Sequence, residues 1–138
     1  MEHAATVTRK RWRITARMAL VALLSAYWLS MFLGTHMDRV PKSLAEQSDK
    51  VLHLGGYCGL AVLLLVWRIS RGPASFRTVA LIWLLIASYG ALDEITQPLS
   101  GRQCEFADWI ADLIGAALGL AVTWPLASRL FGRMRPSA

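Results

Sequence analysis

The fold is decided by residues 88–112, which read SYGALDEITQPLSGRQCEFADWIAD. The residues before this stretch, 79–87, are almost entirely apolar, and so are most of those after Trp109. Charged side chains and a turn sequence therefore stand where two apolar segments meet. Two interpretations follow, an ordinary exposed loop between two helices or a polar site at a membrane surface. The rest of the chain decides between them.

The composition of the chain combines hydrophobicity with basic charge. Of its 138 residues, 55% are hydrophobic, and 15 Lys and Arg against 9 Asp and Glu give a formal net charge of +6. This length limits the chain to one domain. The basic residues flank long apolar runs instead of clustering with aromatic residues on a polar face. The pattern therefore predicts a membrane protein with no nucleic-acid partner.

Four apolar segments have the length and composition of transmembrane helices. Residues 18–37 contain no Asp, Glu, Lys or Arg, and about 20 apolar residues cross a bilayer. A cleaved signal peptide is the alternative, but no Ala-x-Ala-like site ends this stretch, so an uncleaved first span is favoured. Residues 51–67, 78–96 and 109–127 predict three further spans. The predicted fold class is an all-α membrane protein with four transmembrane helices.

The segments outside the spans are short and polar. Residues 38–50 predict a polar connector with some local helix, Gly72-Pro73 predicts a turn, and Pro98 with Gly101 is expected to end the third span. The expected organisation is a basic cytoplasmic N-terminal segment at 1–17, a single transmembrane domain at 18–128 and a basic cytoplasmic tail at 129–138. Cys58 and Cys104 have no metal-like spacing and are expected to be unpaired thiols.

The distribution of Lys and Arg predicts the orientation in the membrane, because short loops rich in these residues mark the cytoplasmic side. With the N-terminus inside, the inner side has one acidic residue, Glu2. It also has most of the basic residues, namely Arg9, Lys10, Arg11, Arg13, Arg17, Arg68, Arg71, Arg77, Arg129, Arg133 and Arg135. Both termini are therefore predicted to be cytoplasmic.

This topology brings polar residues of three helices to the outer side of the membrane. Spacing of three or four residues places them on one face of each helix. The three stripes are Asp49, His53 and Tyr57; Tyr89, Asp93 and Gln97; and Glu105, Asp108 and Asp112, with Glu94 three residues before Gln97. Gly55 and Gly59, like Gly115 and Gly119, have the spacing that permits close helix contact. We therefore expect an outward-facing polar crevice.

Energetic cost favours a shared site over separate exposed charges. A charged side chain at the middle of a span costs about 2.5–3.5 kcal/mol, and less near the interface, so several acids are expected to face one another instead of lipid. The alternative is that these groups only cap helices and pair, with Asp49 as an N-cap and Arg102 bridging an acid. The crevice has more acidic residues than the helix ends need as caps, so capping alone does not account for them.

The residue types at the crevice indicate ligand binding or acid–base chemistry. His53 is a candidate general base or metal ligand, and Asp49 is placed to orient its ring. The carboxylates suit a divalent cation as cofactor, but no spacing is diagnostic, so the metal ligands stay unassigned. Arg102 is placed to bind a carboxylate or phosphate through two hydrogen bonds, and Lys50 is available to the same anion.

The linked set of motifs resembles the VanZ-like membrane protein family. The residues that carry the resemblance are Asp49-Lys50-x-x-His53-x-x-x-Tyr57, Asp93-Glu94-x-x-Gln97, Gly101-Arg102, Asp108 and Asp112-x-x-Gly115. The family commonly has Asn at the position of Asp112, so this chain has an added charge there. The resemblance implies a bacterial multi-pass protein of the cytoplasmic (inner) membrane and cell envelope. The founding member is associated with resistance to the glycopeptide teicoplanin.

Two functions are compatible with the crevice. In the first, the protein is not an enzyme and binds an anionic lipid, a cell-wall precursor or an amphiphilic antibiotic. The ligand-binding residues would be Lys50, Tyr57, Tyr89, Asp93, Gln97, Arg102, Asp108 and Asp112. In the second, it is an intramembrane, metal-dependent or metal-free enzyme acting on a lipid-linked substrate.

For the enzyme, His53 would be the general base, Asp49 would orient it, and Glu94 and Asp112 would be acids or metal ligands. A proton or ion pathway is disfavoured because the charges stop short of the inner side. Whether the protein catalyses a reaction, and its oligomeric state, are not decided by the sequence.

Overall fold

The computed structural model describes residues 2–37 and 42–132. Within these ranges the chain forms four α-helices and one short 3₁₀-helix: α1 (Glu2–His36), α2 (Lys42–Ile69), α3 (Phe76–Thr96), η1 (Gln97–Ser100) and α4 (Phe106–Gly132). Four segments of these helices are long and apolar enough to cross a membrane, namely Ile14–His36, Asp49–Ile69, Phe76–Ser100 and Phe106–Arg129. The predicted four-helix membrane fold is confirmed.

The helices extend beyond the predicted spans. α1 is continuous across residues 17 and 18, and α4 continues past residue 128 to Gly132, so neither predicted domain boundary is a break in a helix. α2 begins at Lys42, so the local helix expected in the polar connector is present and runs without a break into the second span. Residues 38–41 of the predicted connector lie outside the described residues. The sequence Leu-Ala-Glu-Gln at 44–47 favours a helix. Asp49 therefore lies inside α2, and the alternative in which it is an N-cap is excluded.

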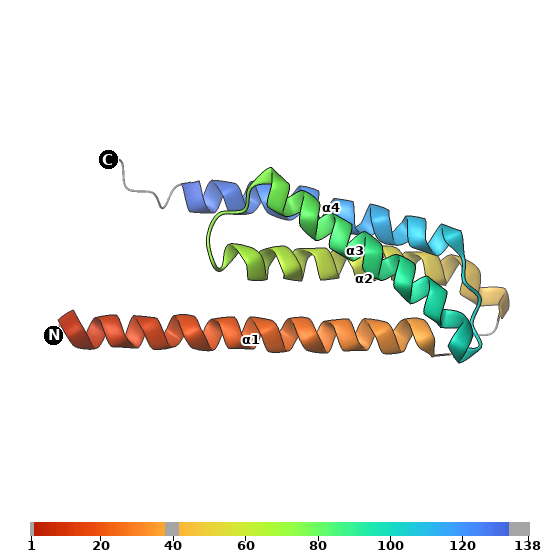
Figure 1. The fold of residues 1–138 in the computed structure, drawn as a ribbon, viewed down its shortest axis with the longest axis horizontal. Coiled ribbons are helices and arrows are strands. Elements are labelled where there is room, and N and C mark those ends of the chain that lie inside the picture. The colour runs from red at the N-terminus through yellow and green to blue at the C-terminus, as the bar shows by residue number, and fades with distance from the viewer. Residues whose placement is uncertain (1, 38–41, 133–138) are drawn as a thin grey trace.

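The four helices run alternately in opposite directions (Figure 1). The beginning of α1 and the end of α4 lie at one end of the bundle, whereas η1 lies at the other, which we call the site end. α2 packs most extensively on α4, and α3 also packs on α4. α1 runs beside α2 with fewer contacts. The bundle is therefore a close-packed unit of α2, α3 and α4 with a more loosely attached α1.

Two glycines bring α4 directly against the backbone of α2. A Cβ atom on Gly115 would collide with the carbonyl group of Leu54, and one on Gly119 would lie 2.5 Å from the carbonyl oxygen of Cys58. Close helix contact, predicted from the spacing of these glycines, is therefore present in α4.

The glycine pair in α2 behaves differently from the pair in α4. An added Cβ on Gly55 would have nothing within 4 Å, so this glycine does not make the close helix contact that its spacing predicted. Gly59 instead makes room for the hydroxyl of Tyr27, which belongs to α1. The open space beside Gly55 belongs to a pocket between α1 and α2.

Two tryptophans fix the position of α3 relative to α4. Trp83 of α3 donates its indole N–H to the carbonyl oxygen of Leu113 at 3.1 Å, and Trp109 of α4 donates to that of Ala87 at 3.0 Å. Residues 83 and 87 are one helical turn apart, as are residues 109 and 113. The two hydrogen bonds are therefore reciprocal, and together they set the register of this antiparallel pair.

The third span ends as the sequence predicted. α3 stops at Thr96, η1 contains Pro98, and Gly101 has a φ of 85°, a left-handed conformation that favours glycine. The backbone N–H of Arg102 donates to the carbonyl oxygen of Gln97 at 3.3 Å. This tight turn returns the chain toward the bundle and brings Arg102 back to α2.

Candidate functional site

Buried charged residues of three helices gather at the site end. His53 from α2 and Glu94 from α3 are 2% exposed, as are two further acids, Asp93 and Asp108, while Asp112 is fully buried. These are the residues whose helix spacing predicted a polar crevice. The structure brings them together in the interior of the bundle.

His53 is held by Asp112 and not by Asp49. The Nδ1 atom of His53 lies 2.9 Å from Oδ1 of Asp112 and 3.8 Å from Oε1 of Glu94. Asp49, which was expected to orient the ring, instead accepts a hydrogen bond from the guanidinium of Arg102. The prediction was wrong on this pairing because Asp49 shares a helix with His53, whereas Asp112 faces it from α4.

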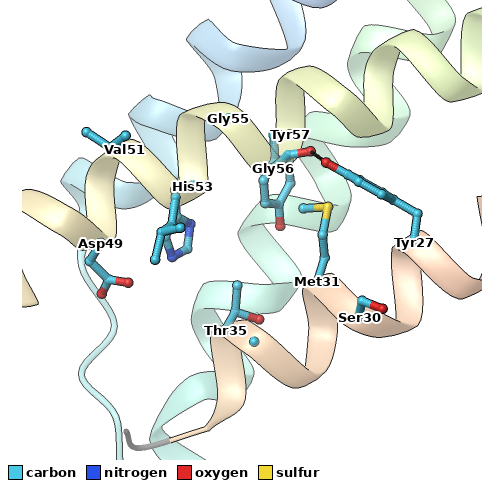
Figure 2. Close-up of a pocket in the computed structure, with 12 residues that line it drawn as sticks. Tyr27, Ser30, Met31, Thr35, Asp49, Val51, His53, Gly55, Gly56 and Tyr57 are labelled. Carbon is cyan, nitrogen blue, oxygen red and sulfur yellow. Dashed lines mark hydrogen bonds between the residues drawn. The ribbon is translucent and has the colours of Figure 1, made fainter. Parts of the chain in front are cut away.

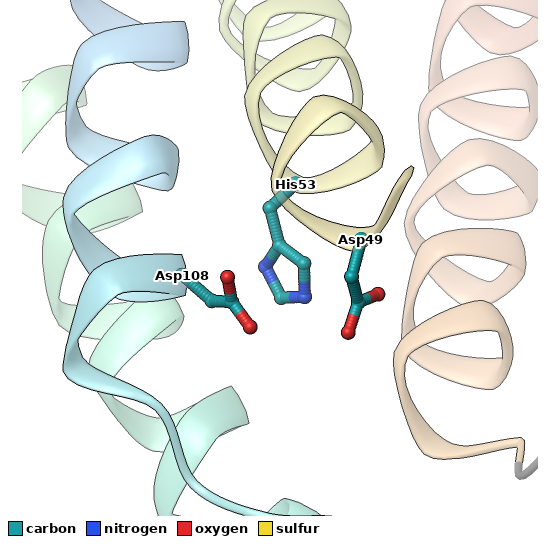
Figure 3. Close-up of side chains that lie close together, drawn as sticks. All are labelled: Asp49, His53 and Asp108. Atoms are coloured by element: carbon teal, nitrogen blue, oxygen red, sulfur yellow. The ribbon is translucent and has the colours of Figure 1, made fainter. Parts of the chain in front are cut away.

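The His53 ring lies between two further carboxylates, those of Asp108 on α4 and Asp49 on α2 (Figure 3). Potential metal-binding atoms of Asp49, His53 and Asp108 all lie within 4.8 Å of one another. The same is true of His53, Glu94 and Asp112. His53 is therefore shared by two groups of residues, each of which has the composition of a metal site.

Both cations predicted to hold an anion are paired with acids. Arg102 forms an ion pair with Asp49. The Nζ atom of Lys50 lies 3.2 Å from Oε2 of Glu105 and 3.6 Å from Oδ1 of Asp108. An anionic ligand would therefore have to exchange with a carboxylate or bind through another cation.

Glu94 joins α3 to the loop before α4. Its Oε1 accepts a hydrogen bond from Nε2 of Gln97, and its Oε2 accepts one from the backbone N–H of Glu105, both at 2.9 Å. Gln97 is itself fully buried. The interaction between Glu94 and Gln97 follows from their spacing of three residues. Because both oxygens of Glu94 accept hydrogen bonds, its carboxylate links the end of α3 to the loop before α4.

Asp93 connects the site to α1. Its Oδ1 accepts a hydrogen bond from Thr35 at 3.1 Å, and its Oδ2 accepts one from the hydroxyl of Tyr57 at 3.4 Å. Next to Thr35, His36 places Nδ1 3.7 Å from Oδ1 of Asp93, and its Nε2 lies 3.1 Å from the hydroxyl of Thr96. α1 therefore completes the site.

The sequence-based reasoning missed Thr35 and His36. A signal was present, because Tyr27, Met31 and Thr35 are spaced four residues apart and share one face of α1. This is the spacing that identified the stripes on the other three helices. The hydroxyl of Tyr27 donates to the carbonyl oxygen of Gly56 at 2.9 Å, so this face is the one that contacts α2.

A pocket of about 370 Å³ lies between α1 and α2 (Figure 2). Thr35, Asp49 and His53 form a polar part of its wall, whereas Met31 and Leu52 are among the apolar lining residues. Tyr57 also lines the pocket, as predicted.

Tyr89, the second tyrosine expected in the pocket wall, is not one of its lining residues. It stacks on Tyr57 with a centroid distance of 5.9 Å and makes an edge contact with Trp28 of α1 at 5.0 Å. Tyr89 therefore supports the pocket wall from behind, because it packs against a lining residue and against α1.

The chain was compared with models of protein families, with curated proteins and with solved structures, and none of them matches it. Membership of the VanZ-like family therefore stays a prediction from the motifs.

Proposed function

We propose that this chain is a VanZ-like multi-pass protein of the bacterial cytoplasmic membrane that binds an amphiphile with an anionic head group. An anionic lipid, a lipid-linked cell-wall precursor and an amphiphilic glycopeptide share this chemistry, and binding the last would link the protein to teicoplanin resistance. The observation that carries the proposal is the pocket between α1 and α2, in which polar and apolar residues meet.

The pocket suits the junction between a head group and its hydrocarbon chain. Thr35 and His53 offer hydrogen-bonding groups, and Met31 and Leu52 offer apolar contact to the adjoining chain. A volume of about 370 Å³ is at the lower end of the range for small-molecule pockets, about 300–1,000 Å³. It accommodates a head group with the first part of a chain and leaves the remaining hydrocarbon among the surrounding lipids.

The rim of the pocket has groups that bind anions. Asp49 lines the pocket, and Arg102 is paired with it, so a phosphate that displaces this carboxylate meets the planar fork of a guanidinium. Lys50 lies next to Asp49 in the sequence and contacts Glu105. The charge distribution of the sequence supports an outward orientation of this end, where a cell-wall precursor or glycopeptide is available.

Filling the pocket tests the proposal. An added Cβ on Gly34 or Gly55 has nothing within 4 Å, and both glycines line the pocket, so Gly34→Phe and Gly55→Phe reduce its volume without a steric clash at the first side-chain atom. Ala117→Phe, on an exposed position of α4, is the matched control. Retention of phosphatidylglycerol, an undecaprenyl-linked precursor and teicoplanin is measured separately by native mass spectrometry, with phosphatidylcholine as the uncharged reference.

We expect retention of at least one anionic amphiphile by the wild type and by Ala117→Phe, and a loss of about tenfold or more, equivalent to about 1.4 kcal/mol, in both pocket-filling variants. The amphiphile retained identifies the ligand class. Retention that is equal in all three variants, or a wild type that prefers phosphatidylcholine, would contradict the proposal.

The pairing of His53 with Asp112 supports a second candidate function, an enzyme that acts on a lipid-linked substrate. A histidine oriented by a buried carboxylate through Nδ1 has the arrangement of a general base. Incubation with a radiolabelled undecaprenyl-linked substrate, with Zn²⁺ or Mg²⁺ and without them, distinguishes the two functions. Turnover that disappears in His53→Ala favours the enzyme, whereas retention without any product favours the binding protein.

A further inference from the structure

Four buried side-chain atoms of the site have no hydrogen-bond partner among the described residues, namely Nε2 of His53, Oδ1 of Asp108, Oδ2 of Asp112 and Oε1 of Gln97. The first two belong to His53 and Asp108, which are 2% exposed and lie together with Asp49. Lys50 lies 3.6 Å from this Asp108 oxygen, which is too far for a hydrogen bond. Buried polar atoms are nearly always satisfied, so a pair of neighbouring exceptions calls for a ligand.

The contact with Asp112 places a proton on Nδ1 of His53. Nδ1 lies 2.9 Å from a carboxylate oxygen of Asp112, and a carboxylate accepts hydrogen bonds, so Nδ1 carries the proton and donates it. In the neutral ring, Nε2 is then a lone-pair donor. A histidine that gives one N–H to a carboxylate and uses its other nitrogen for coordination is the common arrangement at protein metal sites.

The groups next to His53 complete a donor set. Carboxylate oxygens of Asp49 and Asp108 and a ring nitrogen of His53 lie within 4.8 Å of one another, from two adjacent helices (Figure 3). One imidazole with two carboxylates suits Zn²⁺ or Mn²⁺ better than Ca²⁺ or Mg²⁺, which prefer oxygen ligands alone. Arg102 donates to Oδ2 of Asp49, and the second oxygen of that carboxylate completes the set.

The charge balance of the buried cluster favours a cation. Four carboxylates are buried here, those of Asp93, Glu94, Asp108 and Asp112, whereas His53 is the only fully buried basic residue described beside them. Of these carboxylates, the half-buried Lys50 and His36 reach only those of Asp108 and Asp93, at 3.6 and 3.7 Å. Buried carboxylates are stable when they are paired with positive charge or coordinated to a metal. A divalent cation supplies that charge without bringing in a further side chain.

We propose that Asp49, His53 and Asp108 bind a divalent transition-metal cation, Zn²⁺ or Mn²⁺, and that Asp112 positions the His53 ring for it. Coordination through Nε2 leaves the hydrogen bond to Asp112 intact. In the neighbouring group of His53, Glu94 and Asp112, the His53 atom that faces both acids is Nδ1, which is already hydrogen-bonded to Asp112, and both oxygens of Glu94 already accept hydrogen bonds. The metal site requires no amphiphile in the pocket and therefore does not depend on the proposed function.

The site has two consequences for the chemistry of the pocket. Asp49 and His53 both line the pocket, so coordination positions not taken by protein are on the pocket side. If the pocket binds an anionic amphiphile as proposed above, its phosphate or carboxylate takes such a position, which explains how a site rich in acids holds an anion. A metal on Nε2 also removes the lone pair that a general base requires.

Titration of the purified protein with metal alone tests the site. The protein in detergent is stripped with a chelator, and Zn²⁺ and Mn²⁺ are titrated separately, with bound metal counted by elemental analysis. We expect one ion per chain, a loss of affinity of about 100-fold or more in His53→Gln and Asp108→Asn, and a loss of about 10–100-fold in Asp112→Asn. His36→Gln is the matched control, and we expect its affinity within about threefold of the wild type. Glu94→Gln separates the two groups of residues, and we expect it to lose less affinity than Asp108→Asn.

A second measurement uses the wild type alone, so it does not depend on whether a variant folds. Zn²⁺ is expected to raise the unfolding temperature, a chelator to reverse the increase, and Co²⁺ to give the absorption bands of a nitrogen and oxygen ligand set. Absence of uptake by the wild type would overturn the proposal, as would unchanged affinity in Asp108→Asn. A loss in Glu94→Gln with retention in Asp108→Asn would assign the ion to the other group.

Discussion

The position of Asp112 depends on glycines on either side of it. A Cβ atom on Gly90 would lie 2.9 Å from Oδ2 of Asp112, so this glycine of α3 gives the carboxylate its space. One turn further along α4, Gly115 packs on the backbone at Leu54 and holds α4 against α2. Asp112 brings a negative charge to its hydrogen bond with His53.

A single methyl group on Gly115 is expected to destabilise the protein. Its Cβ would collide with the Leu54 carbonyl, and overpacking of this kind costs about 1–3 kcal/mol. Gly55→Ala is the matched control, because its Cβ meets only open space and alanine favours a helix by about 0.5–1 kcal/mol relative to glycine. Thermal unfolding in detergent should therefore show a lower midpoint for Gly115→Ala and an equal or higher one for Gly55→Ala. Equal losses in both variants would argue against the close contact.

The sequence predicted which polar residues meet, but not how they pair. Spacing of four residues is a local property, so it placed Asp49 with His53 correctly on one face of α2. The actual partner of His53, Asp112, is 59 residues away along the chain. Which of several acids reaches a histidine depends on the rotation and crossing of α2 and α4, and spacing within one helix contains no information on these.

At the scale of elements, the reciprocal tryptophan bonds are what prevents α3 from sliding along α4. Both helices are apolar along most of their length, so hydrophobic contact alone leaves their register weakly specified within lipid. An indole ring has a single N–H donor, and the hydrogen bond that it makes is strongly directional. Two such donors, Trp83 and Trp109, acting in opposite directions across the interface select one register.

Removal of either indole donor is expected to weaken this interface. Trp83→Phe and Trp109→Phe keep an aromatic ring but lose the hydrogen bonds to Leu113 and Ala87, and such bonds within membranes contribute about 0.6 kcal/mol on average, up to about 1.7 kcal/mol. Trp12→Phe, at a 75% exposed position of α1, is the control. Unfolding by denaturant in micelles measures the change. Stabilities of Trp83→Phe and Trp109→Phe that match that of Trp12→Phe would contradict a role in register.

The four spans were predictable, whereas the attachment of α1 was not. Span length and hydropathy are local, and each predicted span lies within one observed helix, apart from Met37, which directly follows α1. α1 has no Asp, Glu, Lys or Arg between residues 18 and 36. It therefore has no stripe of charged residues from which its contact with the other helices could be predicted. Its contribution comes from uncharged hydrogen-bonding groups, Tyr27 and Thr35, and from His36 at its last turn.

Across the whole molecule, polarity is confined to one end. The described residues of the core away from the site end are apolar, among them Leu65, Leu120 and Ala127. No continuous line of titratable side chains crosses the part of the bundle that the structure describes. This distribution fits a site that binds its ligand at one membrane face, and it argues against a proton or ion pathway.

The orientation of the whole molecule is testable with its own cysteines. Cys58 and Cys104 are both free thiols, and Cys104 is exposed in the loop after Gly101 at the site end. If this end faces outward, a membrane-impermeant maleimide added to intact spheroplasts should label the wild type and Cys58→Ser, but not Cys104→Ser. Mass spectrometry of the purified protein measures the labelling. Labelling that requires lysis of the spheroplasts would reverse the predicted orientation.

The pocket lies between two neighbouring spans, one of them loosely attached, and exposed side chains such as Val51 and Leu52 line it. If the pocket binds an amphiphile as proposed, that molecule would reach it by lateral diffusion within the bilayer. Occupancy would then depend on the mole fraction of the molecule among the lipids of one leaflet. Even weak intrinsic affinity would fill the pocket with an abundant lipid, so competition within the leaflet would determine which molecule is bound.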